Sequence, residues 1–180
     1  TFSAMTGGNI YLKYENSQKT GSFKIRGASN KIAALVERGE TGAVVASSAG
    51  NHAQGVAYAA HRFGIPATIV MPKTAPIAKA KATEGYGATV VLAGDCYDDA
   101  YAKAREICEQ EHATFLHPYN DPEVIAGQGT LGLEILGDLP TADIVIVPAG
   151  GGGLLAGVAA CIKQINPRVQ VIGVQAEGAD

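Results

Sequence analysis

Stretches with the spacing of strands and stretches with the spacing of helices alternate along the whole 180-residue chain. Short β-branched or apolar runs predict strands, and apolar residues three or four positions apart predict helices. The predicted strands are residues 10–14, 43–46, 67–71, 89–92, 114–116, 144–147 and 169–174. The predicted helices are residues 22–38, 51–63, 77–86, 97–111, 121–136 and 154–165. This alternation is typical of βαβ units with right-handed crossovers, so the predicted fold class is α/β.

Local signals support these boundaries. Asp121 followed by Pro122 predicts a helix N-cap with proline in the first helical position, and Gly64 and Gly87 stand where helices should stop. The run 144–147 is apolar at every position, which is typical of a parallel strand covered by helices on both faces. We therefore expect doubly wound, mostly parallel sheets in one or two small domains.

Composition narrows the class of protein. With 47% hydrophobic and 17% charged residues, the chain suits a layered fold with much buried surface. A net charge of −3 without runs of like charge disfavours a nucleic-acid or anionic-membrane partner. The apolar stretches are too short to span a bilayer. Three cysteines without paired spacing favour a reducing compartment over disulfides or a zinc site, and no signal peptide is visible, so we expect a cytoplasmic protein.

Three turns are the candidate ligand sites, because ligands of α/β folds bind at the carboxyl ends of strands beside helix N-termini. They are the turn before Lys24, the turn at residues 47–52 and the turn at residues 150–153. The first follows a predicted strand through a short loop, and the other two follow predicted strands directly.

Four consecutive glycines precede the last predicted helix. They are Gly150, Gly151, Gly152 and Gly153, with Leu154 next. Glycine permits positive φ and adds no side chain, so successive N–H groups can wrap an oxyanion, and the helix dipole adds to the attraction. A phosphate is therefore the expected ligand. A dinucleotide is the rival, because Gly151-x-Gly153-x-x-Ala156 fits a loose dinucleotide fingerprint.

A second glycine pattern carries less weight. Gly127, Gly129 and Gly132 match G-x-G-x-x-G but lie inside a predicted helix rather than after a strand. We expect these glycines to permit close packing between helices.

The turn at residues 47–52 is small and polar. It contains Ser48, Ala49, Gly50, Asn51 and His52. Its N–H groups could receive a carboxylate, and Asn51 could donate to a phenolate oxygen. An ordinary serine N-cap is the plain alternative. His52 is a candidate base, although a structural hydrogen bond at a helix start fits it better.

Lys24 is predicted at the start of a helix. The positive end of the helix dipole disfavours its charge and lowers its pKa. Schiff-base chemistry requires such a neutral amine, so Lys24 is a candidate nucleophile. A solvated surface lysine is the alternative.

Taken together, these motifs resemble the serine/threonine dehydratase family of fold-type II pyridoxal-phosphate enzymes. The resemblance covers essentially the whole chain and rests on five segments in order: KYEN at 13–16, QKTGSFKIRGA at 18–28, SAGNHAQG at 48–55, AGQGT at 126–130 and GGGGL at 150–154. It implies a fold like that of the tryptophan synthase β chain. Residues 43–120 would form a small domain inserted in a large one made of residues 1–42 and 121–180.

The resemblance also implies the cofactor and its ligands. Lys24 would carry pyridoxal 5′-phosphate as a Schiff base, with Phe23 against the ring. Asn51 would hydrogen-bond the 3′ oxygen of the ring. The backbone amides of residues 150–154 would cradle the phosphate. The substrate carboxylate would rest on residues 48–52.

The implied activity is that of a lyase converting L-threonine, and also L-serine, to a 2-oxo acid and ammonia. Lys24 would remove the Cα proton. Ala49 stands where serine racemases usually have a second serine, and Tyr119 stands where they tend to have asparagine, so a dehydratase is favoured. A racemase, a β-replacing synthase and a non-catalytic cofactor-binding module remain alternatives. A homo-oligomer in amino-acid metabolism, such as isoleucine biosynthesis, is expected.

The chain departs from the family pattern at its ends. It begins with Thr1 near the family's first strand and stops at Asp180, before the residue that contacts the pyridine nitrogen. Truncation at both ends is therefore expected, with apolar sheet and helix faces left uncovered. Gln175 stands where the family's divalent-cation site usually has a glutamate, so no metal is assigned.

Overall fold

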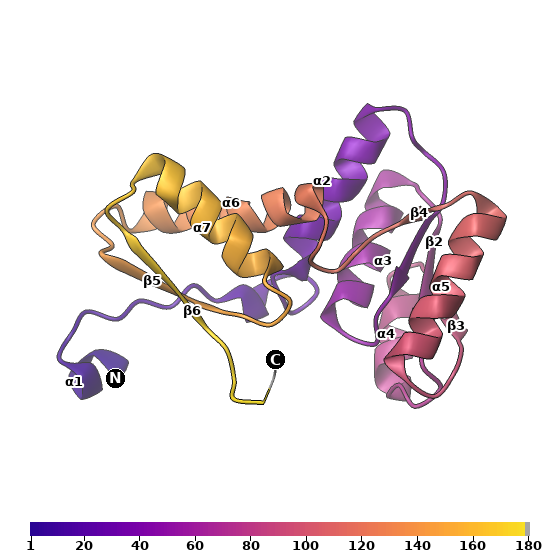
Figure 1. The fold of residues 1–180 in the computed structure, drawn as a ribbon, viewed down its shortest axis with the longest axis horizontal. Helices are drawn as coiled ribbons and strands as arrows, with labels where there is room; N and C mark the ends of the chain where they lie inside the picture. Colours follow the sequence, from indigo (N-terminus) through magenta and orange to yellow (C-terminus); the bar gives the residue numbers. More distant parts are fainter. Residues whose placement is uncertain (179–180) are drawn as a thin grey trace.

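A computed structural model describes residues 1–178 of the chain (Figure 1). A four-stranded sheet with its helices lies at one end of the molecule, and a two-stranded sheet with two helices lies at the other. Both sheets are entirely parallel, with helices between successive strands. The α/β class predicted from the alternating pattern is confirmed.

The four-stranded sheet has the order β3-β2-β1-β4. Its strands are β1 (Val44–Ser47), β2 (Ala67–Met71), β3 (Thr89–Leu92) and β4 (Thr114–Phe115). Helices α3 (Asn51–Phe63) and α4 (Ile77–Gly85) lie on one face, and α5 (Tyr97–Glu111) lies on the other. Successive side chains of β1 lie on opposite faces of the sheet. Val44 and Ala46 pack in the core under α3, and Val45 packs in the core under α5.

The two-stranded sheet is covered on one face only among the described residues. It pairs β5 (Ile144–Pro148) with β6 (Gln170–Val174). Helices α6 (Pro122–Asp138) and α7 (Gly153–Ile165) pack on the face that carries Val145 and Val147. Ile144 and Ile146 on the opposite face are 52% and 64% exposed. The expectation that residues 144–147 are buried on both faces is therefore wrong for the part of the chain the structure describes.

Helix α2 (Lys24–Glu37) joins the two ends of the molecule, because it packs on α3 and on α6 (Figure 1). Glycines make these contacts close. A Cβ on Gly55 of α3 would lie 3.1 Å from the carbonyl carbon of Lys24, and one on Gly127 of α6 would lie 2.7 Å from the Arg26 carbonyl oxygen. The packing role expected for Gly127 is confirmed.

The predicted strand at residues 10–14 is wrong. This stretch has no regular structure and follows a short helix, α1 (Phe2–Thr6), that the sequence did not predict; a 3-10 turn, η1 (Glu15–Ser17), comes after it. Ion pairs hold it instead of a sheet: Lys13 Nζ lies 3.0 Å from a carboxylate oxygen of Glu134 on α6.

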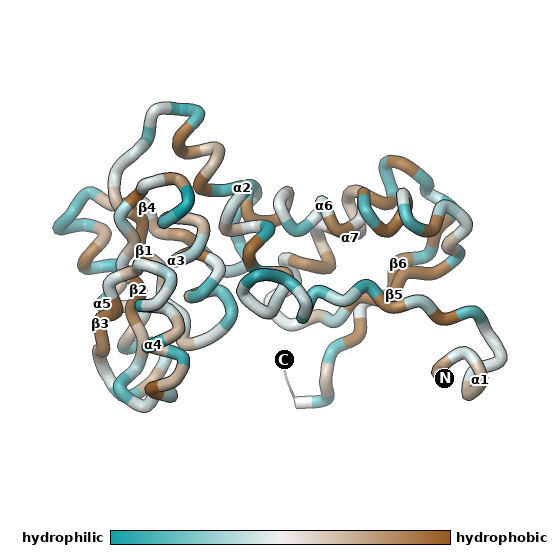
Figure 2. Tube along the Cα trace, turned by 180° about the vertical axis from the view of Figure 1, so that it is seen from behind, coloured by the Kyte–Doolittle hydropathy of each residue, from teal (hydrophilic) through white to brown (hydrophobic). Residues whose placement is uncertain are grey.

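The remaining boundaries agree with the sequence to within two residues. Asp121 caps α6 by accepting from two backbone amides, with Pro122 at the first helical position, and Gly64 ends α3 in the left-handed conformation. Apolar residues concentrate on the strands and on the helix faces that meet them (Figure 2). Within residues 1–178, no helix has the length and apolar character needed to cross a bilayer.

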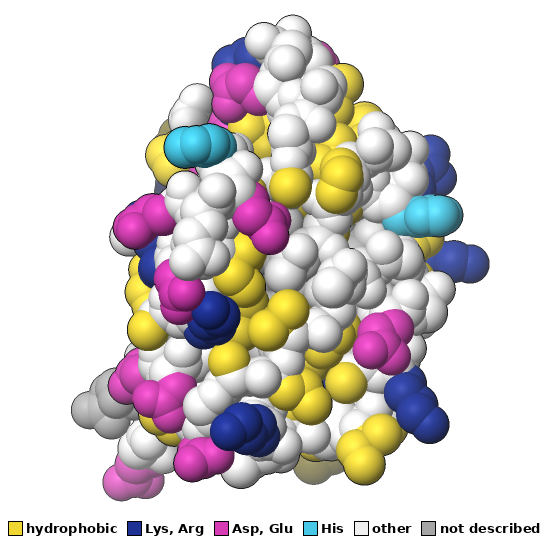
Figure 3. Space-filling model, turned by 90° about the vertical axis from the view of Figure 1, so that its right-hand side faces the viewer, with side chains coloured by type: hydrophobic (Ala, Val, Ile, Leu, Met, Phe, Trp, Pro, Cys, Tyr) yellow, Lys and Arg dark blue, Asp and Glu magenta, His cyan; other side chains and the backbone are white. Residues whose placement is uncertain are grey.

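Charges of both signs are interspersed on the face of the molecule drawn in Figure 3, which is the side of Figure 1 where α5 lies. On that face neither sign gathers into a single patch. The distribution agrees with the absence of like-charge runs in the sequence.

Candidate functional site

The three turns singled out from the sequence are linked in space by one short segment, residues 116–120, which we call the linking segment. Its first carbonyl, of Leu116, accepts a hydrogen bond from the ring of His52 at 3.0 Å. Its third carbonyl, of Pro118, accepts from Lys24 Nζ at 2.8 Å. Its Tyr119 ring lies against the four consecutive glycines at residues 150–153, which we call the glycine run. The site is built around this segment.

Lys24 is the first residue of α2, as predicted. Its amine donates to Pro118 and lies 5.3 Å from the centroid of the Phe23 ring. Burial lowers the pKa of the Lys24 amine, because desolvation disfavours the ammonium form. The expected direction is therefore present, and burial is a cause that the sequence did not supply. A partly desolvated lysine suits a nucleophilic amine.

The glycine run links β5 to α7 through a left-handed residue. Gly152 has φ 81° and is the N-cap of α7, which begins at Gly153. Among residues 1–178, the amides of Gly150, Gly151 and Gly152 donate to no protein atom. Free amides at a helix N-terminus are an anion-binding arrangement.

The linking segment closes one side of this loop. A Cβ on Gly151 would lie 2.5 Å from ring atoms of Tyr119, and one on Gly153 would lie 2.9 Å from the Tyr119 backbone. Gly153 is therefore glycine for lack of space, in addition to any ligand role. A pocket of about 290 Å³ opens beside the loop; its lining comprises Tyr119, Asn120, Ile125, Gly151, Gly152, Gly153 and Ala156. Leu154 packs its side chain into the core between β5 and α7.

The polar turn after β1 presents the start of α3. Ser48 Oγ accepts from the Gly50 amide at 3.2 Å, and Asn51 is the exposed first residue of the helix. Ala49 packs at the edge of the core under α3. The amides at the start of α3 and the Asn51 side chain are thus placed to bind polar groups of a ligand.

His52 makes the structural hydrogen bond that the sequence favoured. It is 3% exposed, and burial lowers the pKa of its imidazole to about 4. Its Nδ1 has no hydrogen-bond partner among the described residues. A buried neutral ring bonded to a backbone carbonyl does not suit a solvent-exchanging base.

Sequence reasoning missed the linking segment because it acts mostly through backbone groups. Every residue has a backbone carbonyl, so the residue types do not reveal that those of Leu116 and Pro118 accept these hydrogen bonds. The side chain that could have indicated the segment is His117. Its Nδ1 accepts a hydrogen bond from the Asn120 amide at 2.8 Å, and its ring packs edge-on against the Tyr119 ring with 4.6 Å between the ring centroids.

These groups fit a ligand that carries both a carbonyl and a phosphate. The amine of Lys24 suits the carbonyl, and the unpaired amides of the glycine run suit the phosphate. Pyridoxal 5′-phosphate has both groups, so the residues present fit the cofactor that the sequence implied.

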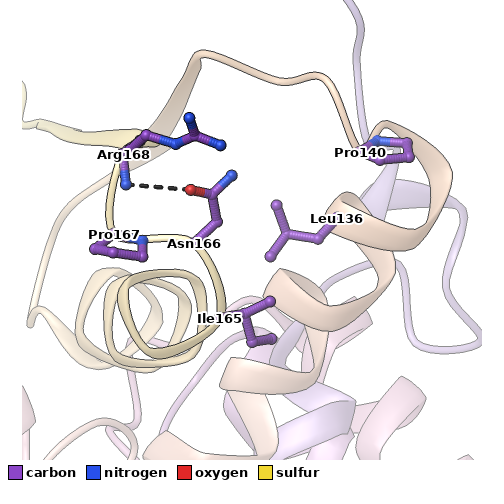
Figure 4. A pocket seen from close by; sticks show the side chains of 6 residues that line it. All are labelled: Leu136, Pro140, Ile165, Asn166, Pro167 and Arg168. Atoms are coloured by element: carbon purple, nitrogen blue, oxygen red, sulfur yellow. Dashed lines mark hydrogen bonds between the residues drawn. The ribbon is translucent and has the colours of Figure 1, made fainter.

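A larger pocket of about 580 Å³ lies elsewhere, at the ends of α6 and α7 (Figure 4). It is lined by Leu136, Pro140, Ile165, Asn166, Pro167 and Arg168. The Arg168 amide donates to the Asn166 side chain at 3.2 Å, which closes the turn after α7. None of the three turns contributes to it, so it is separate from the candidate site.

Known proteins resemble the chain over nearly its full length. A profile of the family described as "Pyridoxal-phosphate dependent enzyme" matches residues 1–180. The L-threonine ammonia-lyase of Thermotoga maritima is 62% identical over 175 residues, which are 97% of this chain and 44% of that protein. The L-threonine dehydratase catabolic TdcB of Escherichia coli K12 is 57% identical over 176 residues, 98% of this chain and 54% of that protein.

Solved structures agree with the sequence relatives. The processed form of threonine deaminase isoform 2 from Solanum lycopersicum superposes with a TM-score of 0.94 at 45% identity, covering 98% of this chain and 48% of that one. Maize serine racemase gives a TM-score of 0.95 at 42% identity, covering 99% of this chain and 54% of that one. The chain spans about half the length of the curated relatives it matches.

Proposed function

Because this chain belongs to the family of pyridoxal-phosphate-dependent enzymes, we propose that it acts as a threonine ammonia-lyase, which converts L-threonine to a 2-oxo acid and ammonia. The substrate is a small amino acid, with L-serine as a second substrate. The relatives at 57% and 62% identity carry the names of threonine dehydratase and threonine ammonia-lyase, which supports this activity.

The observation that carries the proposal is the environment of Lys24. Its amine is desolvated, begins a helix, and is joined through Pro118 to the segment that packs on the glycine run. A lysine needed only for solubility would be exposed and free of such contacts. Burial favours the neutral amine that must attack a carbonyl carbon.

Each turn has a part in holding the cofactor and the substrate. Lys24 would hold the cofactor covalently, Phe23 would lie beside its ring, and the Asn51 side chain would donate to the ring's 3′ oxygen. The phosphate would be bound by the backbone amides of residues 150–154. The backbone amides of residues 48–52 and the hydroxyl of Ser48 would bind the substrate carboxylate. The free amides of Gly150, Gly151 and Gly152 support the phosphate assignment.

When bound, pyridoxal phosphate withdraws electrons from the Cα of the amino acid. Nζ of Lys24, released when the substrate amine takes its place on the cofactor, would accept the Cα proton as the general base. The β-hydroxyl would accept a proton, in balance with the one taken from Cα, and leave as water, and hydrolysis of the released enamine would give ammonia and the 2-oxo acid. Tyr119 packs on the glycine run and lines the pocket beside it.

Serine racemase is the second candidate, since the maize racemase superposes closely. Racemisation needs a base on each face of Cα, and Lys24 supplies one. Ala49, in the polar turn, has no proton-transferring group. This observation favours elimination over racemisation.

Further parts of the proposal concern organisation and setting. Residues 43–120 form a small domain inserted between the two parts of a large one, residues 1–42 and 121–180. The protein is a cytoplasmic homo-oligomer in amino-acid metabolism. Its described cysteines, Cys96, Cys108 and Cys161, are all free, which supports a reducing compartment.

The test is product analysis of the protein loaded with pyridoxal phosphate. L-Threonine and L-serine should each yield a 2-oxo acid and ammonia, and a Lys24→Ala variant should yield neither. Release of D-serine from L-serine without 2-oxo acid would favour the racemase. Binding of cofactor without either product would favour a non-catalytic binding module.

A further inference from the structure

The side chain of His52 is a buried titratable group to which the proposed chemistry gives no role. His52 is the second residue of α3, its side chain is 3% exposed, and its Nε2 lies 3.0 Å from the Leu116 carbonyl oxygen. A carbonyl oxygen only accepts, so Nε2 carries the proton in this bond. Burial lowers the pKa of the ring to about 4, which keeps it neutral near pH 7.

Leu116 is fixed at both of its backbone groups. Its amide donates to the Val45 carbonyl of β1 at 2.8 Å, and its carbonyl accepts from His52. Its side chain is fully buried in the core under α3. The position of Leu116, from which the chain continues after β4, is therefore fixed.

Residues 117–119 connect Leu116 to the candidate site. Two residues on, the Pro118 carbonyl accepts from Lys24 Nζ at 2.8 Å. The His117 ring folds the following turn by accepting from the Asn120 amide, and Tyr119 then packs on Gly151. The path from His52 to the Lys24 amine thus runs through one hydrogen bond, three residues and a second hydrogen bond.

We propose that His52 is a positioning residue for Lys24: its ring N–H holds the Leu116 carbonyl and thereby fixes where the linking segment places the Lys24 amine relative to the glycine run. The inference rests on the proposed function, because the amine so placed is the one that takes up the cofactor. His52 acts through the linking segment and does not itself touch the reacting atoms.

Two substitutions separate the hydrogen bond from the bulk of the ring. His52→Phe keeps an aromatic side chain but leaves the Leu116 carbonyl unpaired. His52→Gln places an amide donor near the former Nε2 and should restore the bond. Val56→Ala, in the same helix and fully buried, is the control for lost stability without a lost hydrogen bond.

The first readout needs no cofactor. Hydrogen–deuterium exchange, followed by mass spectrometry, should quicken across residues 116–120 in His52→Phe, remain near wild type in His52→Gln, and remain near wild type there in Val56→Ala. Exchange in His52→Phe that matches wild type across residues 116–120 would overturn the inference, whatever the cofactor experiments give.

The second readout is the rate at which borohydride traps pyridoxal phosphate on Lys24. We expect His52→Phe to lower this rate by roughly tenfold or more, because misplacement of a reacting group by about 1 Å is enough for such a loss. His52→Gln should recover most of the rate. If Val56→Ala, at an equal loss of thermal stability, lowers the rate as much as His52→Phe, the positioning role is overturned. No adduct on Lys24 in the wild-type protein would instead overturn the proposed function, while the exchange result would still decide whether His52 holds the segment.

Discussion

Tyr119 and Gly151 lie in contact at a distance that admits only glycine. A Cβ on Gly151 would lie 2.5 Å from the Cγ and Cδ1 atoms of the Tyr119 ring. Because Pro118, the neighbour of Tyr119, accepts the hydrogen bond of Lys24, the glycine run and the lysine share one support. A substitution at this contact should therefore change the affinity for a ligand that both of them bind.

Gly151→Ala should raise the Kd for pyridoxal phosphate by about tenfold, equivalent to about 1.4 kcal/mol, because the methyl group displaces the Tyr119 ring or the loop. A titration of cofactor absorbance measures this change. Gly151→Asp should weaken binding further, since it adds a negative charge beside the phosphate.

The double variant Gly151→Ala, Tyr119→Ala distinguishes steric displacement from loss of the amide cradle. If the ring is the obstacle, the alanine at position 151 should cost less affinity when Tyr119 is already absent. Equal losses in both backgrounds would contradict the contact as the cause.

Gly157→Ala should destabilise the fold. A Cβ on Gly157 of α7 would overlap the Ile125 carbonyl oxygen and lie 2.7 Å from the Gly129 amide nitrogen of α6. We expect the free energy of unfolding to fall by about 1–3 kcal/mol, as for other overpacked cores. The matched control is Gly137→Ala in α6, where a Cβ meets no atom within 4 Å; it should raise the free energy of unfolding by up to about 1 kcal/mol. Urea denaturation measures both, and a Gly157→Ala protein as stable as wild type would refute the close approach.

Much of the fold could be predicted from the sequence because its signals are local. Strands β2 and β3 and helices α3 and α5 have the predicted bounds, since β-branched runs and helical spacing are decided within a few residues. The strand at residues 10–14 was wrong because a strand also needs a neighbour to pair with. Among the described residues Ile10 and Leu12 are 42% and 50% exposed, and charge pairs hold the stretch.

The candidate site also has parts that the sequence could predict and parts that it could not. Lys24, the glycine run and the polar turn could be found because their residue types carry the chemistry. The linking segment could not, because its contribution comes from the carbonyls of Leu116 and Pro118. The cause of the lowered pKa of Lys24 also required the fold, since burial depends on residues distant in sequence.

Glu134→Gln should destabilise the protein at neutral pH but not in acid. Arg26 and Lys13 lower the pKa of Glu134 to about 2 from 4.5. The stabilisation is therefore complete above pH 4.5 and is lost as the pH falls through 2. Because Glu134 is 44% exposed, we expect a loss of only about 1 kcal/mol at pH 7.

Glu106→Gln is the matched control for this charge pair. Glu106 pairs with Lys103 along α5, and both side chains are exposed, so no measurable change in unfolding midpoint is expected. A Glu134→Gln deficit that is the same at pH 7 and below pH 2 would contradict an electrostatic origin.

Lys24 should react with acetic anhydride at a lower pH than an ordinary lysine. Burial lowers the pKa of its amine, so the reactive neutral form should reach half of its maximum below pH 10.5. Competitive labelling with mass spectrometry measures this value. The same residue in urea-unfolded protein is the control, and an identical labelling profile in folded and unfolded protein would rule out the desolvated amine.

The measurement that tests the central claim most directly is borohydride trapping of pyridoxal phosphate on the folded protein, followed by digestion and mass spectrometry. The proposed function requires a reduced adduct on Lys24 and none in a folded Lys24→Ala variant. An adduct on another lysine, or no adduct on the folded wild-type protein, would contradict the assignment of Lys24 as the residue that carries the cofactor.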